Sequence, residues 1–167
     1  MNGTVHRGLF LTSHVFLTSH LEEIKGYIKK YSAKALYITG HSMGGGIATL
    51  LTLLLLPLKA ELDACTSRPN GLVLKAITFA TPPTVSSELC EIFDRYPGIS
   101  ETYVNENDII SRLSYGNAMD LKALMNAAKE ILKGDGNSNE KLRLLEKRHQ
   151  EIKQSGLNPK VCFFFFF

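Results

Sequence analysis

The stretch ALYITGHSMGGG, residues 35–46, decides the fold of this chain. Its first five residues are apolar or β-branched and predict a short strand that is buried on both faces. The apolar residues from Met43 to Leu56 predict a helix, because a strand precedes them and Pro57 follows them. Ser42 is therefore expected at a sharp turn between a core strand and a helix.

Further elements alternate along the chain on both sides of this turn. The sequence predicts a surface connection at residues 60–70, a strand at 72–79, a helix at 87–96 and a strand at 102–105. Upstream, a capping box formed by Ser19 and Glu22 and apolar residues at helical spacing predict a helix from about Ser19 to Tyr31. Alternating strands and helices are typical of an α/β protein with a doubly wound, mostly parallel sheet.

The character of the chain changes after this region. Asn117 and Asp120 open a predicted helix that Gly134 ends, and a last helix is expected at residues 140–154. We therefore divide the chain into an α/β core at residues 1–116 and a helical hairpin with a Phe-rich tail at residues 117–167. The five terminal phenylalanines are too few to cross a bilayer, and we interpret them as the end of a truncated reading frame, with an interfacial anchor as the alternative.

Composition limits the partners and the compartment. The chain has 167 residues, of which 44% are hydrophobic, so one domain with a real core is expected. Its 19 basic and 16 acidic residues give a net charge of only +3, which gives no support for a nucleic-acid partner. The three cysteines, Cys65, Cys90 and Cys162, have no metal or redox spacing and predict free thiols in a reducing compartment.

The apolar segments bear on localisation. No signal peptide is visible, and the apolar run at residues 47–58 is too short to span a bilayer, so we expect a cytoplasmic or peripheral membrane protein. From Leu121 onward the chain has nine basic and five acidic residues. These would help the appended helices rest on anionic lipid, although a solvated helix face is the simpler interpretation.

The turn at Ser42 carries the pattern of a catalytic serine. A serine hydroxyl becomes a nucleophile when a histidine removes its proton, and it must stand clear of the backbone. We expect the turn to require Gly40 and Gly44, because a side chain at either position would crowd it. We also expect the N–H of Met43 to donate to an oxyanion. The alternative is that Ser42 only caps the helix.

An acid and a base are needed as partners of Ser42. Asp108 follows the third predicted strand, at the strand ends where α/β sheets place their sites, although it could also be a turn-forming aspartate. His149 is the only histidine after Asp108, and the alternative is an ordinary helix histidine. We interpret His6 and His41 as structural supports, and His14 and His20 as surface or capping residues.

Four sequence blocks together resemble the class 3, or fungal-type, lipases. They are VHRGLF at residues 5–10, GHSMGGG at 40–46, TFATP at 78–82 and VNENDIISRL at 104–113. The segment at residues 105–115 is most similar to the sn-1-specific diacylglycerol lipase branch. The resemblance implies an α/β-hydrolase fold, Ser42 as nucleophile, Asp108 as triad acid, hydrolysis of diacylglycerol or triacylglycerol, and no metal or organic cofactor.

The chain also departs from the family pattern at both ends. The loop that supplies a second oxyanion donor and the last strand with its histidine have no match, so we interpret the chain as truncated at both ends, and His149 matches no family motif. Two other functions stay open: a catalytically impaired fragment or interaction protein, and a carboxylesterase or acyltransferase acting on soluble acyl esters. Lipid esters are the expected partners, and peripheral membrane contact is left open.

Overall fold

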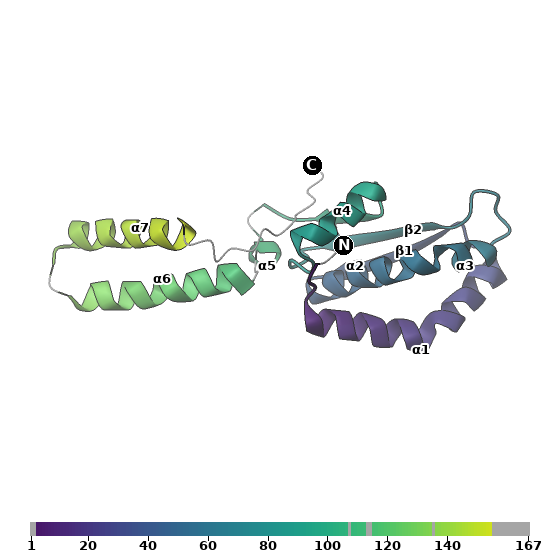
Figure 1. The fold of residues 1–167 in the computed structure, drawn as a ribbon, viewed down its shortest axis with the longest axis horizontal. Helices are drawn as coiled ribbons and strands as arrows, with labels where there is room; N and C mark the ends of the chain where they lie inside the picture. Colours follow the sequence, from purple (N-terminus) through teal and green to yellow (C-terminus); the bar gives the residue numbers. More distant parts are fainter. Residues whose placement is uncertain (1–2, 107, 113–114, 135, 155–167) are drawn as a thin grey trace. The chain divides into compact units, whose positions relative to one another are not determined.

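The computed structural model describes residues 3–106, 108–112, 115–134 and 136–154, which divide into two compact units (Figure 1). Within the described residues, the first unit contains the sheet and runs to Arg112. The second contains two long helices. Expectations for Cys162 and for the Phe-rich tail fall outside the described residues.

The first unit alternates helices and strands, as the sequence predicts. Its elements are α1 (Arg7–Tyr31), β1 (Ala35–His41), α2 (Met43–Leu55), a 3₁₀ turn η1 (Leu56–Leu58), α3 (Lys59–Ala64), β2 (Val73–Phe79), α4 (Ser87–Arg95), β3 (Ser100–Tyr103) and α5 (Ile109–Arg112). The strands lie in the order β1-β2-β3, and both neighbouring pairs are parallel. His41, Phe79 and Tyr103 are register partners, so the carboxyl ends of all three strands meet at one edge. This arrangement is that of an α/β-hydrolase-like fold.

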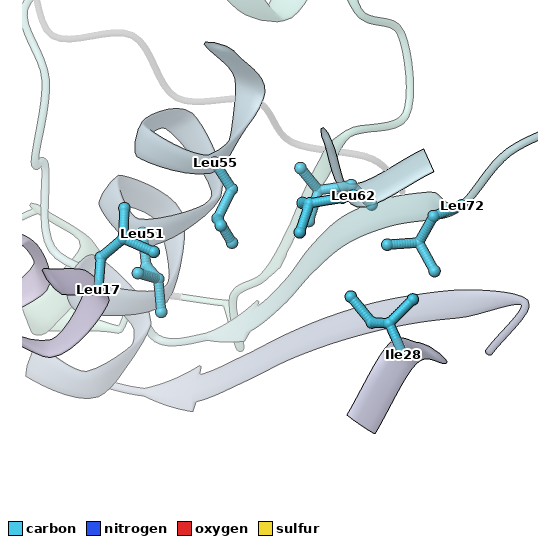
Figure 2. Close-up of a cluster of buried hydrophobic side chains, with 7 residues drawn as sticks. Leu17, Ile28, Leu51, Leu55, Leu62 and Leu72 are labelled. Atoms are coloured by element: carbon cyan, nitrogen blue, oxygen red, sulfur yellow. The ribbon is translucent and has the colours of Figure 1, made fainter. Parts of the chain in front are cut away.

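Helices α2 and α1 build the core on one face of the sheet. Helix α2 packs on β1 and β2, and α1 packs on α2. Seven buried side chains from α1, α2, α3 and the start of β2 form the main cluster (Figure 2). They are Leu17, Ile28, Leu51, Leu55, Leu62, Leu72 and Leu74. Burying each such side chain contributes about 1.5–3 kcal/mol, so this cluster holds α2, and with it the turn at Ser42, against the sheet.

The opposite face of the sheet is exposed at alternate positions. Tyr37, Val73, Phe79 and Tyr103 are each about half exposed, from 45% to 59%. The expectation that the strand at residues 35–39 is buried on both faces is therefore wrong. Successive strand residues point to opposite faces, and α2 covers only one face of β1.

Helix α1 begins well before the predicted start at Ser19, so the capping box there is wrong. Its N-cap is His6, whose Nδ1 accepts a hydrogen bond from the Leu9 N–H at 3.3 Å. Hydroxyl side chains in the part of α1 before Ser19 bond to carbonyls of the helix itself. Thr12 and Ser13 donate to carbonyls one turn earlier, at 3.0 and 2.9 Å. The predicted end is correct, since Ser32 is the left-handed C-cap.

The predicted surface connection at residues 60–70 is also wrong in its first part, because it contains α3. Pro57 ends α2 but fits the first turn of η1, where its missing N–H is not needed. The continuous helical path from Met43 to Ala64 has 22 residues and contains an 18-residue window with a mean hydropathy of 1.6, so by length and composition it could span a bilayer, contrary to expectation. Here Leu55 and Leu62 on this path are fully buried in the core.

The second unit is a helical hairpin of α6 (Tyr115–Lys133) and α7 (Ser138–Gln154). The two helices pack against each other and half-bury Leu124, Ile131 and Leu145. The Lys141 ammonium of α7 donates to the Leu132 carbonyl of α6 at 3.2 Å. Both helices begin a few residues earlier than predicted.

Candidate active site

Ser42 sits at a strained turn between β1 and α2. Its backbone has φ 54° and ψ −124°, a conformation that non-glycine residues rarely adopt. Its N–H donates to the Phe79 carbonyl at 2.9 Å, and its own carbonyl accepts from the Gly45 N–H at 2.9 Å. Because β2 and the first turn of α2 hold its backbone on both sides, the strained turn persists.

The crowding at the turn falls on Gly40 rather than on Gly44. A Cβ on Gly40 would collide with the Gly44 carbonyl and lie 2.7 Å from the backbone nitrogen of Gly45. A Cβ on Gly44 would meet nothing within 4 Å, so our steric reason for Gly44 is wrong. A Cβ on Gly46 would lie 2.6 Å from Thr84 Cγ2, so glycine is needed there for close packing.

The Ser42 hydroxyl is not used to cap α2. Ser42 is the N-cap residue, yet its side chain makes no capping hydrogen bond. The alternative that Ser42 is a plain capping residue is therefore wrong. Within the described residues no backbone carbonyl accepts from the first-turn N–H groups of Met43 and Gly44, which leaves them available to a developing oxyanion.

The turn after β2 lies beside the turn at Ser42, and sequence reasoning did not assign it a role. Ala80 has φ 50°, and its N–H donates to the Tyr103 carbonyl at 2.9 Å. The buried Thr81 hydroxyl has no hydrogen-bond partner in the described part of the chain and packs against the backbone at Gly45. A glycine normally signals such a positive φ, so nothing at Ala80 marked this turn in the sequence.

Asp108 follows β3 at the same edge of the sheet as Ser42. Its Oδ1 accepts from the Ile110 N–H at 2.8 Å, and its own N–H donates to the Asn105 carbonyl at 3.0 Å. The turn-forming role considered as an alternative is therefore real. It leaves Oδ2 without a hydrogen bond to any described residue, so the carboxylate is both oriented and able to accept a further donor.

The histidines of the first unit occupy structural or surface positions. His6 caps α1, which agrees with the expectation that it is a structural residue. His14 and His20 are exposed on α1, where their rings lie 6.1 and 4.6 Å from those of Phe10 and Phe16. They are surface residues and cap no helix.

The two remaining histidines are also exposed. His41 ends β1 directly before Ser42, and His149 lies on α7 in the second unit. Within the described ranges, no hydrogen bond joins a histidine to Ser42 or to Asp108. The structure therefore orients the candidate nucleophile and the candidate acid without showing the base between them.

The described residues also contain a charged pair on the open face of the sheet. The Lys75 ammonium lies 2.5 Å from Glu101 Oε1, and this hydrogen bond raises the pKa of Lys75 and lowers that of Glu101. The pair joins β2 to β3. No group of three or more His, Cys, Asp or Glu side chains that could hold a metal ion occurs among these described residues.

A parallel sheet with a strained serine at a strand-to-helix turn is the arrangement of an α/β-hydrolase-like fold. The family described as Lipase (class 3) matches residues 1–118, and the chain therefore belongs to the class 3 lipases. The chain is also 32% identical over 83 residues to "Phospholipase A1 PLIP2, chloroplastic" of Arabidopsis thaliana. That match covers 49% of this chain and 11% of the Arabidopsis protein.

Proposed function

We propose that this chain hydrolyses acyl esters of lipids, with Ser42 as the nucleophile. The observation that carries the proposal is the Ser42 hydroxyl, which makes no capping hydrogen bond at its strained turn and lies beside N–H groups of α2 from which no described backbone carbonyl accepts. Membership of the class 3 lipases supports ester hydrolysis. Peripheral contact with a lipid surface is part of the proposal, because such substrates reside in lipid aggregates.

The proposed reaction assigns one step to each of these groups. Ser42 Oγ attacks the ester carbonyl while a histidine accepts its proton, and the Met43 N–H stabilises the oxyanion that forms. The C–O bond to the alcohol then breaks, and the histidine returns the proton to that alcohol. Water next attacks the acyl-serine and releases the fatty acid. Asp108, held by the Ile110 N–H, would orient the histidine through Oδ2, which bonds to no described residue.

For the substrate we propose an acylglycerol, either diacylglycerol or triacylglycerol, from the similarity of residues 105–115 to the diacylglycerol lipases. The name of the Arabidopsis relative adds phospholipids as a second class to be tested. Fatty-acid release from diacylglycerol, triacylglycerol, phosphatidylcholine and a soluble p-nitrophenyl ester tests the proposal. We expect Ser42→Ala to abolish release and Ser67→Ala, at an exposed serine, to leave it unchanged. Release that survives Ser42→Ala would refute the proposal.

A second candidate function is supported by one observation. No described histidine is hydrogen-bonded to Ser42, as expected of an impaired hydrolase or an interaction protein. His149→Ala separates the two: a loss of about a hundredfold or more in fatty-acid release identifies His149 as the base. The other outcome is a parent chain that releases no fatty acid by itself. If added imidazole then restores release in the parent but not in Ser42→Ala, the site lacks its base.

A further inference from the structure

The second unit has an uncovered apolar side, carried mainly by α6. Leu121, Met125 and Leu132 are 55%, 54% and 63% exposed, and the half-buried Ala128 lies between them at helical spacing. We call these four residues the α6 stripe. At 100° per residue they fall within about 60° of one another, so they form one continuous row along the helix.

The α6 stripe does not face α7. The residues that α7 half-buries, Leu124 and Ile131, lie on an adjacent side of α6. The groove between the helices opens on the other side of the hairpin, where Glu130, Arg148 and Glu151 are among the lining residues. The Arg148 guanidinium lies 2.9 Å from Glu151, so that side is mixed in charge.

Lysines border the α6 stripe on its outer edge. Lys122, Lys129 and Lys133 follow the stripe residues by one position, which places them about 100° around the helix on one side. Lys133 pairs weakly with Glu130 at 3.5 Å, at an exposed site. Within the part of the hairpin that the structure describes, Lys122 and Lys129 have no ion-pair partner. Apolar residues edged by lysines on long, flexible stems are suited to a surface with an anionic layer above an apolar one.

Helix α7 adds less to this side. Leu142 is 57% exposed and His149 is also exposed at helical spacing from it, but Glu146 lies between them. A carboxylate in that position opposes an anionic surface. The stripe and its lysines on α6 therefore form the centre of the surface, and α7 lies at its margin.

We propose that the α6 stripe and its three lysines dock this chain onto an anionic lipid bilayer. Leu121, Met125 and Leu132 would enter the boundary between headgroups and acyl chains, and the lysines would reach the anionic headgroups. The helix then lies in the plane of the surface. This inference rests on the proposed lipid contact, but it does not require ester hydrolysis.

Sedimentation of the full chain with ether-lipid vesicles tests the proposal without hydrolysis. We expect binding to vesicles that contain anionic phosphatidylserine, much weaker binding to phosphatidylcholine alone, and a decrease with added salt. Ser42→Ala should bind like the parent, which separates failure of docking from failure of catalysis. Equal binding to both vesicle types, no binding to either, or loss of binding in Ser42→Ala would overturn the proposal.

Two sets of substitutions locate the surface. Each lysine near an anionic membrane contributes about fivefold to partitioning, so Lys122→Gln, Lys129→Gln and Lys133→Gln together should lower binding by about a hundredfold. The matched control neutralises three exposed lysines of the first unit: Lys29→Gln, Lys30→Gln and Lys34→Gln. An equal loss in both triple variants would refute a role of α6.

The apolar part is tested in the same way. Leu121→Ser, Met125→Ser and Leu132→Ser together should lower binding at least about tenfold. The control removes three exposed apolar side chains of α1: Leu11→Ser, Val15→Ser and Phe16→Ser. Circular dichroism checks that the helices persist, and if the serine variant loses its helices the lysine variants still decide the question. Unchanged binding in a folded α6 variant would contradict the proposal.

Discussion

Gly40→Ala tests whether close packing at the end of β1 shapes the turn at Ser42. The added Cβ would collide with the Gly44 carbonyl and lie 2.7 Å from the Gly45 nitrogen. Both obstacles are backbone atoms at the start of α2, so they cannot rotate away as a side chain would. Relief requires α2 to move from the sheet, at a cost of about 1–3 kcal/mol by analogy with overpacked cores.

Gly44→Ala is the matched control, because the same methyl group there meets nothing within 4 Å. Alanine is favoured over glycine in a helix by up to about 1 kcal/mol, so this variant should equal or exceed the parent in stability. The melting temperature of a chain of this size changes by about 2–4 °C per kcal/mol. We therefore expect Gly40→Ala to melt several degrees below the parent and Gly44→Ala at or above it.

Thermal unfolding followed by circular dichroism measures both variants. A Gly40→Ala protein that melts with the parent, or a Gly44→Ala protein that loses as much as Gly40→Ala, would refute the reasoning. A second readout is the reactivity of Ser42 toward a fluorophosphonate, which should fall in Gly40→Ala because the shift displaces the turn.

Three further predictions concern stability. Leu55 is fully buried, so Leu55→Ala should lower the free energy of unfolding by about 2–5 kcal/mol in a urea titration. Leu11 is 48% exposed, so Leu11→Ala should change that free energy by less than about 0.5 kcal/mol. Similar losses in the two variants would contradict the assignment of Leu55 to the core. Ser13→Ala removes a buried hydroxyl that bonds carbonyls of both α1 and α2, and should cost about 0.5–1.5 kcal/mol in the same titration, so an unchanged midpoint would count against that link. Burial acts to raise the pKa of Asp63, but hydrogen bonds from Lys59 and from the Leu72 N–H outweigh it and hold the pKa below 3.8. The stabilisation is thus complete above pH 3.8 and is lost as the pH falls through the lowered pKa, so Asp63→Asn should flatten the acid side of the stability profile, and an unaltered profile would show that Asp63 contributes nothing.

The strands and the turn at Ser42 could be predicted because their signals are local. Apolar and β-branched runs marked β1 and β2, and the glycines marked the sharp turn between β1 and α2. The start of α1 was missed because hydroxyls interrupt its apolar pattern, and only the structure shows that Thr12 and Ser13 bond to carbonyls one turn earlier. Helix α3 was missed because Pro57 ends α2 without ending the helical path.

The candidate site was predictable to the same extent. The positions of Ser42 and Asp108 could be predicted because each follows a strand, and the parallel register brings strand ends to one edge; their roles stay predictions. The sequence could not show that the steric requirement falls on Gly40 and not on Gly44, because this depends on the direction in which each Cβ would point. The base could not be assigned either, because a histidine becomes a base through its position in space and not through its neighbours in the sequence.

The central claim is that Ser42 is the nucleophile of an ester hydrolase, and covalent labelling tests it most directly. The full chain is incubated with a fluorophosphonate, digested and analysed by mass spectrometry, with Ser42→Ala and Ser67→Ala as the paired variants. We predict one modified peptide that contains Ser42, absent from Ser42→Ala and retained in Ser67→Ala. A parent chain that takes up no label, or a Ser42→Ala chain that takes up as much label as the parent, would contradict the claim.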